Sequence, residues 1–124
     1  ESDMDNNAIV MRLEKGRFSF LLTADTMQEA EFELMQRRAA LKSMVLKVGH
    51  HGSDTSTTPE FLATVNPQIA VISSGADNRF GHPGDEVIER LEDGVGQWNI
   101  YRTDLHGTIE FITDGERLWI ETGK

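Results

Sequence analysis

Two adjacent histidines between glycines follow a short apolar run, and this arrangement limits the possible folds more than any other feature of the chain. Residues 44–48 are mostly apolar and lead into Gly-His-His-Gly at residues 49–52. Such a run is typical of a buried strand that delivers its last side chains to a sheet edge. A second apolar run, residues 18–24, ends at Asp25. We therefore expect strand ends that carry imidazole and carboxylate groups, together half of a metal site.

The length, composition and charge of the chain limit the number of domains, the kind of metal site and the partners that it can have. A chain of 124 residues buries one modest core, so we expect one domain or part of one. There is no cysteine, so a metal would be held by imidazole and carboxylate. The net charge of −9 weighs against broad contact with nucleic-acid phosphates, and a phosphate substrate would need a metal to recruit it. The chain has no apolar segment long enough to span a membrane, and its first residues lack signal-peptide features.

The apolar periodicity predicts alternating strands and helices, with an antiparallel hairpin at each end of the chain. The expected strands are residues 8–13, 17–22, 44–48, 68–72, 97–101, 108–112 and 117–121. The expected helices are residues 26–41, a short helix from a Thr58 cap to Asn66, and a helix from Gly84 or Asp85 to Glu92 that ends at Gly94. The fold class is α/β with a mixed sheet. Carboxylates on the helix faces, Glu31 among them, are expected to be solvated.

Asp25 and the histidine pair each have two interpretations. Asp25 precedes a predicted helix, so it could cap that helix or ligate a metal. Adjacent side chains of an extended backbone point to opposite sides, so only one of His50 and His51 would face the same ion as Asp25. The other histidine would contact the substrate or support the ligands.

The predicted loops after the strands carry groups that bind oxyanions. Ser53 lies in one loop, and Asn78, Arg79 and His82 lie in the loop after the strand at 68–72. The same residues could be ordinary turn and cap residues, and spacing does not separate the two interpretations. His106 lies in a predicted hairpin turn, where we expect it to be solvated.

Five pieces of the sequence together resemble a known family. In chain order they are Asn-Asn before the first strand, Phe-Leu-Leu-Thr-Ala-Asp, Leu-Lys-Val-Gly-His-His-Gly-Ser, Val-Ile-Ser-Ser-Gly-Ala-Asp-Asn-Arg-Phe-Gly-His-Pro and Tyr-Arg-Thr-Asp-Leu-His-Gly-Thr-Ile. Their order is similar to the C-terminal half of a metallo-β-lactamase-fold hydrolase, in the branch attached to the ComEC/Rec2 DNA-uptake channel. The resemblance runs from about residue 6 to residue 112. It implies half of an αββα sandwich with about three helices.

The resemblance also implies roles for particular residues. Asp25 would bridge two metals, zinc or manganese, and His51 would ligate the second metal. His50 would lie near the scissile phosphate, and His82 would face the site. Members of the family hydrolyse phosphodiesters, lactones, thioesters or related esters with a metal-bound hydroxide.

The chain departs from the family pattern in two places. Ala24 stands where the family usually has glycine, which matters only if that residue needs a positive φ. The first-half His-x-His-x-Asp-His motif, which supplies most of the ligands, is absent. We therefore expect residues 1–124 to be a single partial domain that is inactive without an N-terminal half. Its sheet face would be covered by that half or by a second copy of the chain.

Two functions follow from this reasoning. The first is the C-terminal part of a metal-dependent hydrolase acting on phosphodiesters, with single-stranded DNA as a candidate substrate. The second is a stand-alone half-domain that homodimerises and serves as a non-catalytic binding module. The compartment depends on the context: extracytoplasmic if the segment belongs to a DNA-uptake channel, cytoplasmic if it is free-standing. In neither case is this segment expected to contact a membrane.

Overall fold

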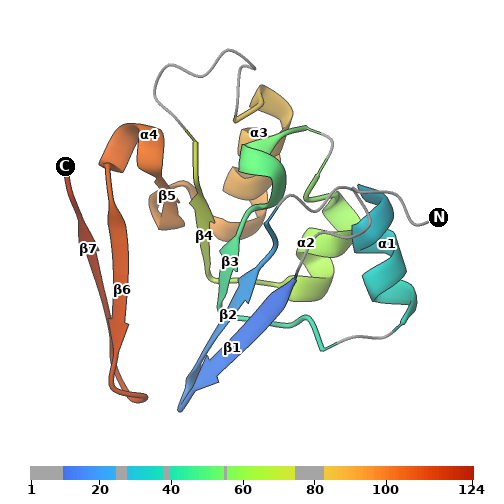
Figure 1. The fold of residues 1–124 in the computed structure, drawn as a ribbon. Coiled ribbons are helices and arrows are strands. Elements are labelled where there is room, and N and C mark those ends of the chain that lie inside the picture. Colours follow the sequence, from blue (N-terminus) through green and yellow to red (C-terminus); the bar gives the residue numbers. More distant parts are fainter. Residues whose placement is uncertain (1–9, 25–27, 38–39, 55, 75–82) are drawn as a thin grey trace.

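The main element of the fold is a mixed five-stranded sheet (Figure 1). A computed structural model describes residues 10–24, 28–37, 40–54, 56–74 and 83–124, without the side chain of His50. The strands are β1 (Met11–Lys15), β2 (Phe18–Leu22), β3 (Val45–Lys47), β4 (Ile69–Ile72) and β5 (Ile100–Arg102), in that order across the sheet. β1 is antiparallel to β2, whereas β2, β3, β4 and β5 are mutually parallel.

Helices connect the parallel strands, and a second sheet follows them. The helices are α1 (Gln28–Gln36), α2 (Pro59–Val65), α3 (Asp85–Val95) and the one-turn α4 (Thr103–His106), with 3-10 turns η2 (Gly49–Gly52) and η3 (Gln97–Asn99). β6 (Ile109–Thr113) and β7 (Leu118–Thr122) form a separate antiparallel pair. Among the described helices, none is long and apolar enough to cross a membrane.

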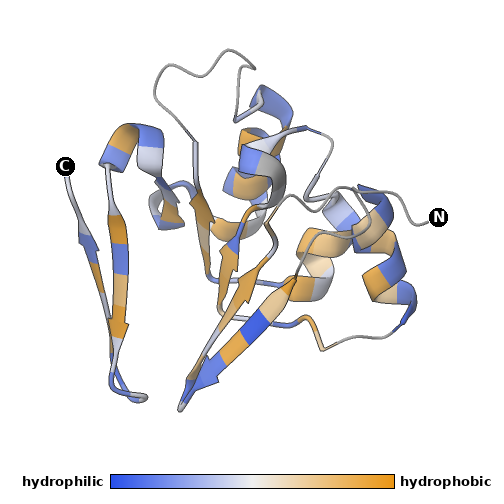
Figure 2. Cartoon of the chain, viewed as in Figure 1, coloured by the Kyte–Doolittle hydropathy of each residue, from blue (hydrophilic) through white to orange (hydrophobic). Residues whose placement is uncertain are grey.

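The core lies on one face of the main sheet. Leu21, Leu46, Ala70 and Ile100 are paired across the four parallel strands, so their side chains share a face. α2 and α3 supply the opposing apolar surface. The buried core cluster is Leu21, Leu41, Leu46, Val48, Phe61, Leu62, Val65, Ala70, Ile72, Val87 and Leu91. The hydrophobic colour that runs along β2, β3 and β4 in Figure 2 follows from burial on this face and partial cover on the other.

The hairpin β6–β7 lies across the other face of the main sheet. The ring of Phe111 contacts Phe20 of β2 at a centroid distance of 5.8 Å and Tyr101 of β5 at 6.5 Å. Where the two hairpin tips meet, the N–H of Arg17 donates to the carbonyl of Gly115 at 2.7 Å (Figure 1). A Cβ on Gly16 would overlap Gly115, so this contact requires a glycine. The second sheet therefore covers part of a face that α2 and α3 leave open.

The α/β class and the hairpins at both ends are confirmed. The short helix α2 is also confirmed: Thr58 is its N-cap and accepts from the N–H of Phe61 at 3.2 Å, and Asn66 ends it with φ 48°. These signals are local, so they could be read without knowing the tertiary structure.

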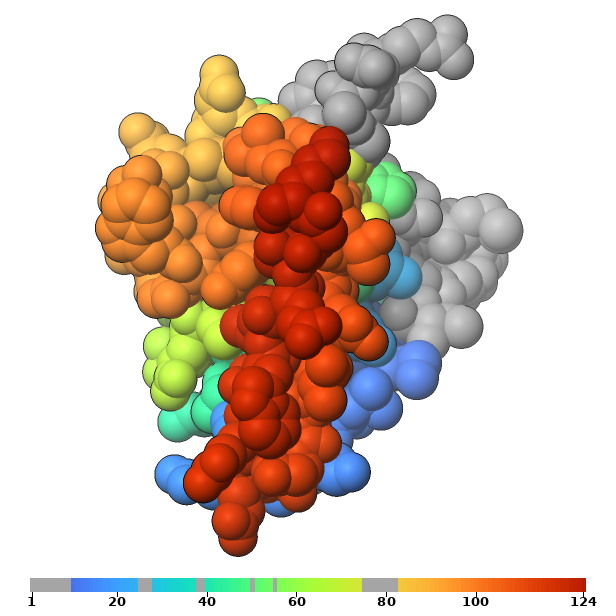
Figure 3. Space-filling view, turned by 90° about the vertical axis from the view of Figure 1, so that its left-hand side faces the viewer, coloured from blue at the N-terminus to red at the C-terminus, as the bar shows by residue number. Residues whose placement is uncertain are grey.

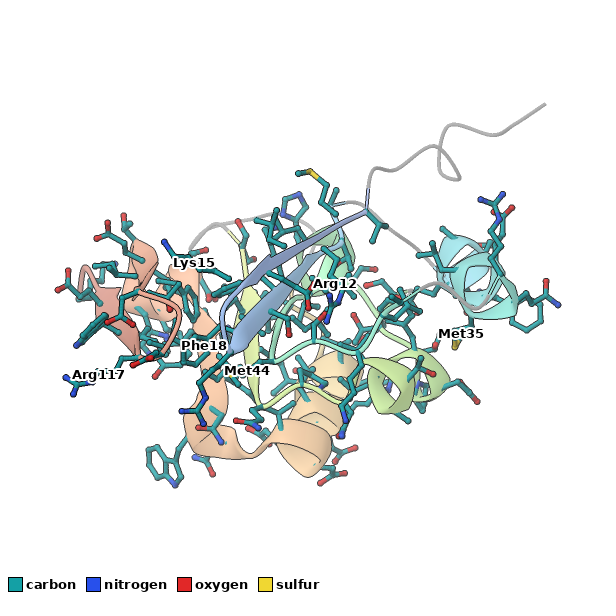
Figure 4. All side chains as sticks on the ribbon, turned by 90° about the horizontal axis from the view of Figure 1, so that it is seen from below. Arg12, Lys15, Phe18, Met35, Met44 and Arg117 are labelled. Carbon is teal, nitrogen blue, oxygen red and sulfur yellow. The ribbon has the colours of Figure 1, made fainter. Side chains whose placement is uncertain are left out.

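The helix predicted over residues 26–41 was too long. α1 ends at Gln36, and residues 40–43 have no regular secondary structure. Arg12 of β1 holds this segment by donating to the carbonyl of Lys42 at 2.8 and 3.0 Å, and the N–H of Ser43 donates to Val65 at 3.2 Å. Helix propensity is outweighed here because the chain must cross to the start of β3. Figure 4 shows Arg12, and also Met35, whose Sδ lies 3.5 Å from the hydroxyl oxygen of Thr64 in α2.

Three predictions in the C-terminal half were also wrong. α3 passes Gly94 and ends at Val95, and its C-cap residue Gly96 has φ 98°. A Cβ on Gly94 would lie 3.0 Å from Leu62, so this glycine allows α2 and α3 to pack closely rather than ending the helix. Residues 97–99 form η3 rather than a strand. α4, not a hairpin turn, connects β5 to β6 because these strands belong to different sheets.

Replacing Thr58 by Ala is expected to lower the free energy of unfolding by about 1 kcal/mol, because α2 loses its N-cap acceptor. Urea denaturation followed by circular dichroism measures the change. Thr64→Ala in the same helix is the control, since its exposed hydroxyl donates within the helix to Glu60, and it should shift stability by less than about 0.5 kcal/mol. Equal losses in both variants would contradict the capping role.

Candidate functional site

The carboxyl ends of β2, β3, β4 and β5 lie at one edge of the main sheet, because these strands are parallel. The segments that leave this edge are residues 23–24, η2, residues 73–74 and the start of α4. In open α/β sheets, this edge is where ligands usually bind. We call it the C-terminal edge.

His51 lies at the C-terminal edge within η2 and is exposed. Its Nδ1 is 2.8 Å from the carbonyl oxygen of Ser73, the first residue after β4. Because a carbonyl only accepts, Nδ1 donates, and a neutral ring then carries its lone pair on Nε2. A backbone carbonyl that orients one ring nitrogen in this way is a common support for a metal-ligating histidine.

The two motifs that contain the histidines meet through their flanking residues. The N–H of Gly84 donates to the carbonyl of Gly52 at 2.8 Å. Gly52 has φ 81°, and a Cβ there would lie 2.6 Å from the Cβ of Pro83. The Gly-His-His-Gly turn therefore contacts Pro83, the last residue of the Gly-His-Pro motif, and Gly84 after it.

The loop after η2 is held by its own polar groups. Ser56 is buried, and its hydroxyl lies 2.9 Å from the carbonyl of Gly49 and 3.1 Å from that of Ser53. Ser53, the predicted substrate contact, is itself only 6% exposed. Its role at the substrate stays a prediction.

Asp54 was not singled out from the sequence, yet it joins this loop to α3. Its Oδ1 accepts from the N–H of Val87 at 3.0 Å. Gly84 is the N-cap residue of α3 and has no side chain to cap it, so the carboxylate of Asp54 takes that role from another segment. The sequence did offer one signal for this contact: Pro83 and Gly84, directly before α3, have no side chain that could cap the helix.

Glu31 was expected to be solvated, but it is buried, with 1% of its surface exposed. Its carboxylate accepts from the N–H groups of Thr57 and, at 2.9 Å, Thr58. Arg90 of α3 donates to the carbonyl of Thr57 at 2.8 Å. Thr57 has φ 53°, an unfavourable conformation for a β-branched residue, and these contacts from α1 and α3 hold it there.

Burial raises the pKa of Glu31 above its usual value, although the hydrogen bonds from Thr58 and Thr57 and the charge of Arg90 act in the opposite direction. The carboxyl group is therefore a strong link between α1 and α2 whose charge is costly to bury. Its partners are backbone groups and a distant arginine, which no sequence pattern reveals.

The start of the loop after β4 is fixed by Thr103. The hydroxyl of Thr103 accepts from the N–H of Ser74 at 2.8 Å and donates to its carbonyl at 2.9 Å. Nearby, Arg102 binds both oxygens of Asp104, at 3.0 and 2.6 Å, and its hydrogen bonds lower the pKa of Asp104. His106, expected to be solvated, is half-buried with Nδ1 2.9 Å from the N–H nitrogen of Arg102.

Several predicted site residues lie outside the described residues: Asp25, Asn78, Arg79, His82 and the side chain of His50. In sequence, Asp25 directly follows Ala24, and Asn78, Arg79 and His82 follow Ser74 by a few residues. Ala24 and Ser74 both lie at the C-terminal edge. Within the part of the chain that the structure describes, no three histidine or carboxylate side chains form a metal-binding group. The metal-ligand assignments therefore stay predictions.

Ala24 itself has φ 36°, so its place at the end of β2 does call for the positive φ that glycine adopts readily. Thr23 beside it donates its hydroxyl to the carbonyl of Lys47, which joins the ends of β2 and β3. The left-handed region costs a residue with a Cβ about 1 kcal/mol. The substitution is thus accommodated with some strain.

Gly52→Ala is expected to lower the free energy of unfolding by about 2 kcal/mol or more, since the new methyl group meets Pro83 as well as straining φ. Thermal or urea denaturation gives the value. Gly96→Ala is a matched control: its φ is 98°, but the nearest atom to a new Cβ is 3.5 Å away. If the two variants lose equal stability, the contact between the two motifs is not tight.

Glu31→Gln tests the buried carboxyl through pH. Because the folded state raises the pKa of Glu31, it binds the proton more tightly than the unfolded chain, whose value is near 4.5. This contribution to stability is complete below the unfolded pKa and is lost as pH rises through the folded pKa. Urea denaturation between acid and neutral pH should show the wild type losing stability relative to the variant as pH rises. A difference that is constant or grows with pH would contradict this.

The chain has clear relatives in sequence. It is 40% identical over 107 residues to ComE operon protein 3 of Bacillus subtilis, which covers 86% of the chain and 14% of that relative. It is 37% identical over 111 residues to competence protein ComA of Neisseria gonorrhoeae, covering 88% of the chain and 16% of that relative. It is 42% identical over 87 residues to recombination protein 2 of Haemophilus influenzae, covering 70% of the chain and 11% of that relative.

The chain thus spans about one seventh of the length of the curated relatives it matches. No family model matches it. No solved structure matches it either. By sequence, the chain is a homologue of one segment of much longer competence and recombination proteins.

Proposed function

We propose that this chain is the C-terminal part of a metal-dependent hydrolase that cleaves phosphodiester bonds, of the ComEC/Rec2 DNA-uptake type, completed by an N-terminal half. The observation that carries the proposal is the orientation of His51 by the Ser73 carbonyl at the C-terminal edge, 2.8 Å away. The names of the relatives, which refer to competence and recombination, support the biological setting.

One described residue of the edge, His51, supports the proposal of a divalent metal site. His51 is supported as a ligating histidine usually is, and Asp25 follows the strained Ala24 at the end of the neighbouring strand. Imidazole and carboxylate suit zinc or manganese. Two ligands do not complete a catalytic site, so the remaining ligands would come from the N-terminal half. When bound, the metal would polarise the phosphodiester and activate a water molecule.

The chain's own residues would position the ligand and the substrate. The contacts of Gly52 with Gly84 and of Asp54 with α3 keep the His51 turn from moving when a substrate arrives. In the proposal, Asn78 and Arg79 bind phosphate oxygens, while His50 and His82 exchange protons with the reacting groups. With a net charge of −9, the chain would depend on the metal to attract a phosphate.

A second candidate is a non-catalytic half-domain that homodimerises. Met11 and Leu13 favour it, since each is 48% exposed on the face of the sheet that carries Phe20. β1 is also an edge strand of the main sheet. An exposed apolar edge of this kind requires cover, either from an N-terminal half or from a second copy.

The hydrolase proposal is tested by exchanging the matching region of the full-length Bacillus subtilis relative for this chain. We expect cleavage of single-stranded DNA that depends on manganese or zinc. Asp25→Ala and His51→Ala should each lower the rate by about a hundredfold or more, because losing a ligand costs at least as much as losing its supporting partner. His106→Ala, a histidine outside the proposed site, should retain the rate within about twofold.

The outcomes separate the alternatives. Cleavage that survives both Asp25→Ala and His51→Ala would refute the site, and a relative that cleaves DNA while the exchanged protein does not would refute the role of this chain. Native mass spectra of the isolated chain, with and without added metal, test the second candidate. A dimer that is indifferent to chelator and takes up no metal would favour the binding module.

A further inference from the structure

The hairpin β6–β7 has an outer face, formed by Glu110, Ile112, Trp119 and Glu121, that is turned away from the main sheet (Figure 3). Ile112 and Trp119 are directly paired across the two strands and are 41% and 45% exposed. Residues that point the other way, such as Phe111, pack on the main sheet. A solvated outer face needs no apolar pair, so this one is available to a partner.

The same face places two carboxylates directly opposite each other. Glu110 of β6 pairs with Glu121 of β7, and both side chains are exposed. Among the described residues, neither takes part in an ion pair. Like charges at directly opposed positions destabilise a two-stranded sheet, and a cation between them would remove the repulsion. The apolar pair and the two carboxylates are neighbours on one surface.

We propose that this outer face docks a basic peptide segment of another protein or domain. The segment would place a lysine or arginine between Glu110 and Glu121 and an apolar side chain on Ile112 and Trp119. A second copy of the chain does not fit, because two such faces would bring four carboxylates together on molecules of net charge −9. Nucleic acid does not fit either, since its phosphates carry the same sign of charge.

The proposal does not depend on the hydrolase. The outer face lies on the side of the second sheet that is away from the main sheet, and none of its four residues belongs to the C-terminal edge. Mutations there can therefore be tested without touching the residues assigned to the candidate site.

The experiment uses Trp119 as its own reporter. Trp98 is almost fully exposed, so Trp98→Phe leaves Trp119 as the single tryptophan of the chain. Capped six-residue peptides of alternating lysine and valine are titrated, with glutamate–valine and serine–valine peptides for comparison. We expect a blue shift of the emission with the lysine peptide alone. No shift, or an equal shift with the serine peptide, overturns the proposal.

Charge-matched variants show whether binding is local. The double variant Glu110→Gln with Glu121→Gln should bind the lysine peptide about tenfold more weakly, as expected from the loss of two exposed ion pairs. Glu89→Gln with Glu92→Gln removes the same charge from exposed positions of α3 and should weaken it by less than about twofold. Equal weakening by the two double variants would mean non-specific attraction and would overturn the proposal.

A single variant guards against simple loss of structure. Glu121→Lys creates an opposite-charge pair with Glu110, so it should raise the melting temperature of the protein. The same variant should abolish the blue shift, because the cation site is filled from within. If stability and binding fall together, the effect is structural and the docking surface is refuted.

Discussion

The parallel pairing of β2, β3, β4 and β5 decides where the polar segments of this chain lie. Each strand runs in the same direction, so every segment that follows a strand emerges at the same edge. The histidine turn, the Ser73–Ser74 segment and Thr103 are far apart in sequence and yet hydrogen-bonded to one another or to shared neighbours there. An all-antiparallel sheet would have divided these groups between two edges.

Hydrogen bonds from other elements hold the described loops at the C-terminal edge. Glu31 of α1 accepts from the N–H of Thr57, and Arg90 of α3 donates to the carbonyl of Thr57. Asp54 accepts from the N–H of Val87 in the first turn of α3. Ala24, His51 and Thr57 all have positive φ without being glycine. Strained residues of this kind persist only where their surroundings determine them, and they concentrate at functional sites. The strained positions therefore cluster at the edge where the proposed site lies.

Local signals predicted much of the fold. Thr58, Pro59 and Asn66 mark both ends of α2 because capping and proline geometry act within a few residues. The two hairpins could also be predicted, from the alternation of apolar and polar residues in the strands and from the turn residues between them. The length of α1 could not be predicted, because the contact that holds residues 40–43 beside β1 comes from Arg12, thirty residues away.

In the candidate site too, local motifs could be predicted from the sequence and contacts between distant segments could not. His51 could be selected from its motif, and its support by the carbonyl of Ser73 could not, because that contact needs the register of β3 with β4. Glu31 looked like one solvated carboxylate among several, and only the packing of α1 on α2 distinguishes it. Contacts between distant segments are thus what the sequence leaves undetermined.

The contact between Phe20 and Phe111 has a consequence for how the protein folds. The open face of the main sheet receives its cover from a hairpin about ninety residues later in the chain, and the tips at Gly16 and Gly115 meet over a similar separation. Contacts of such high sequence separation slow folding, because a long loop must close before they can form. During synthesis, Phe20 and its apolar neighbours remain uncovered until β6 has been made, and in that interval the nascent sheet is most exposed to aggregation.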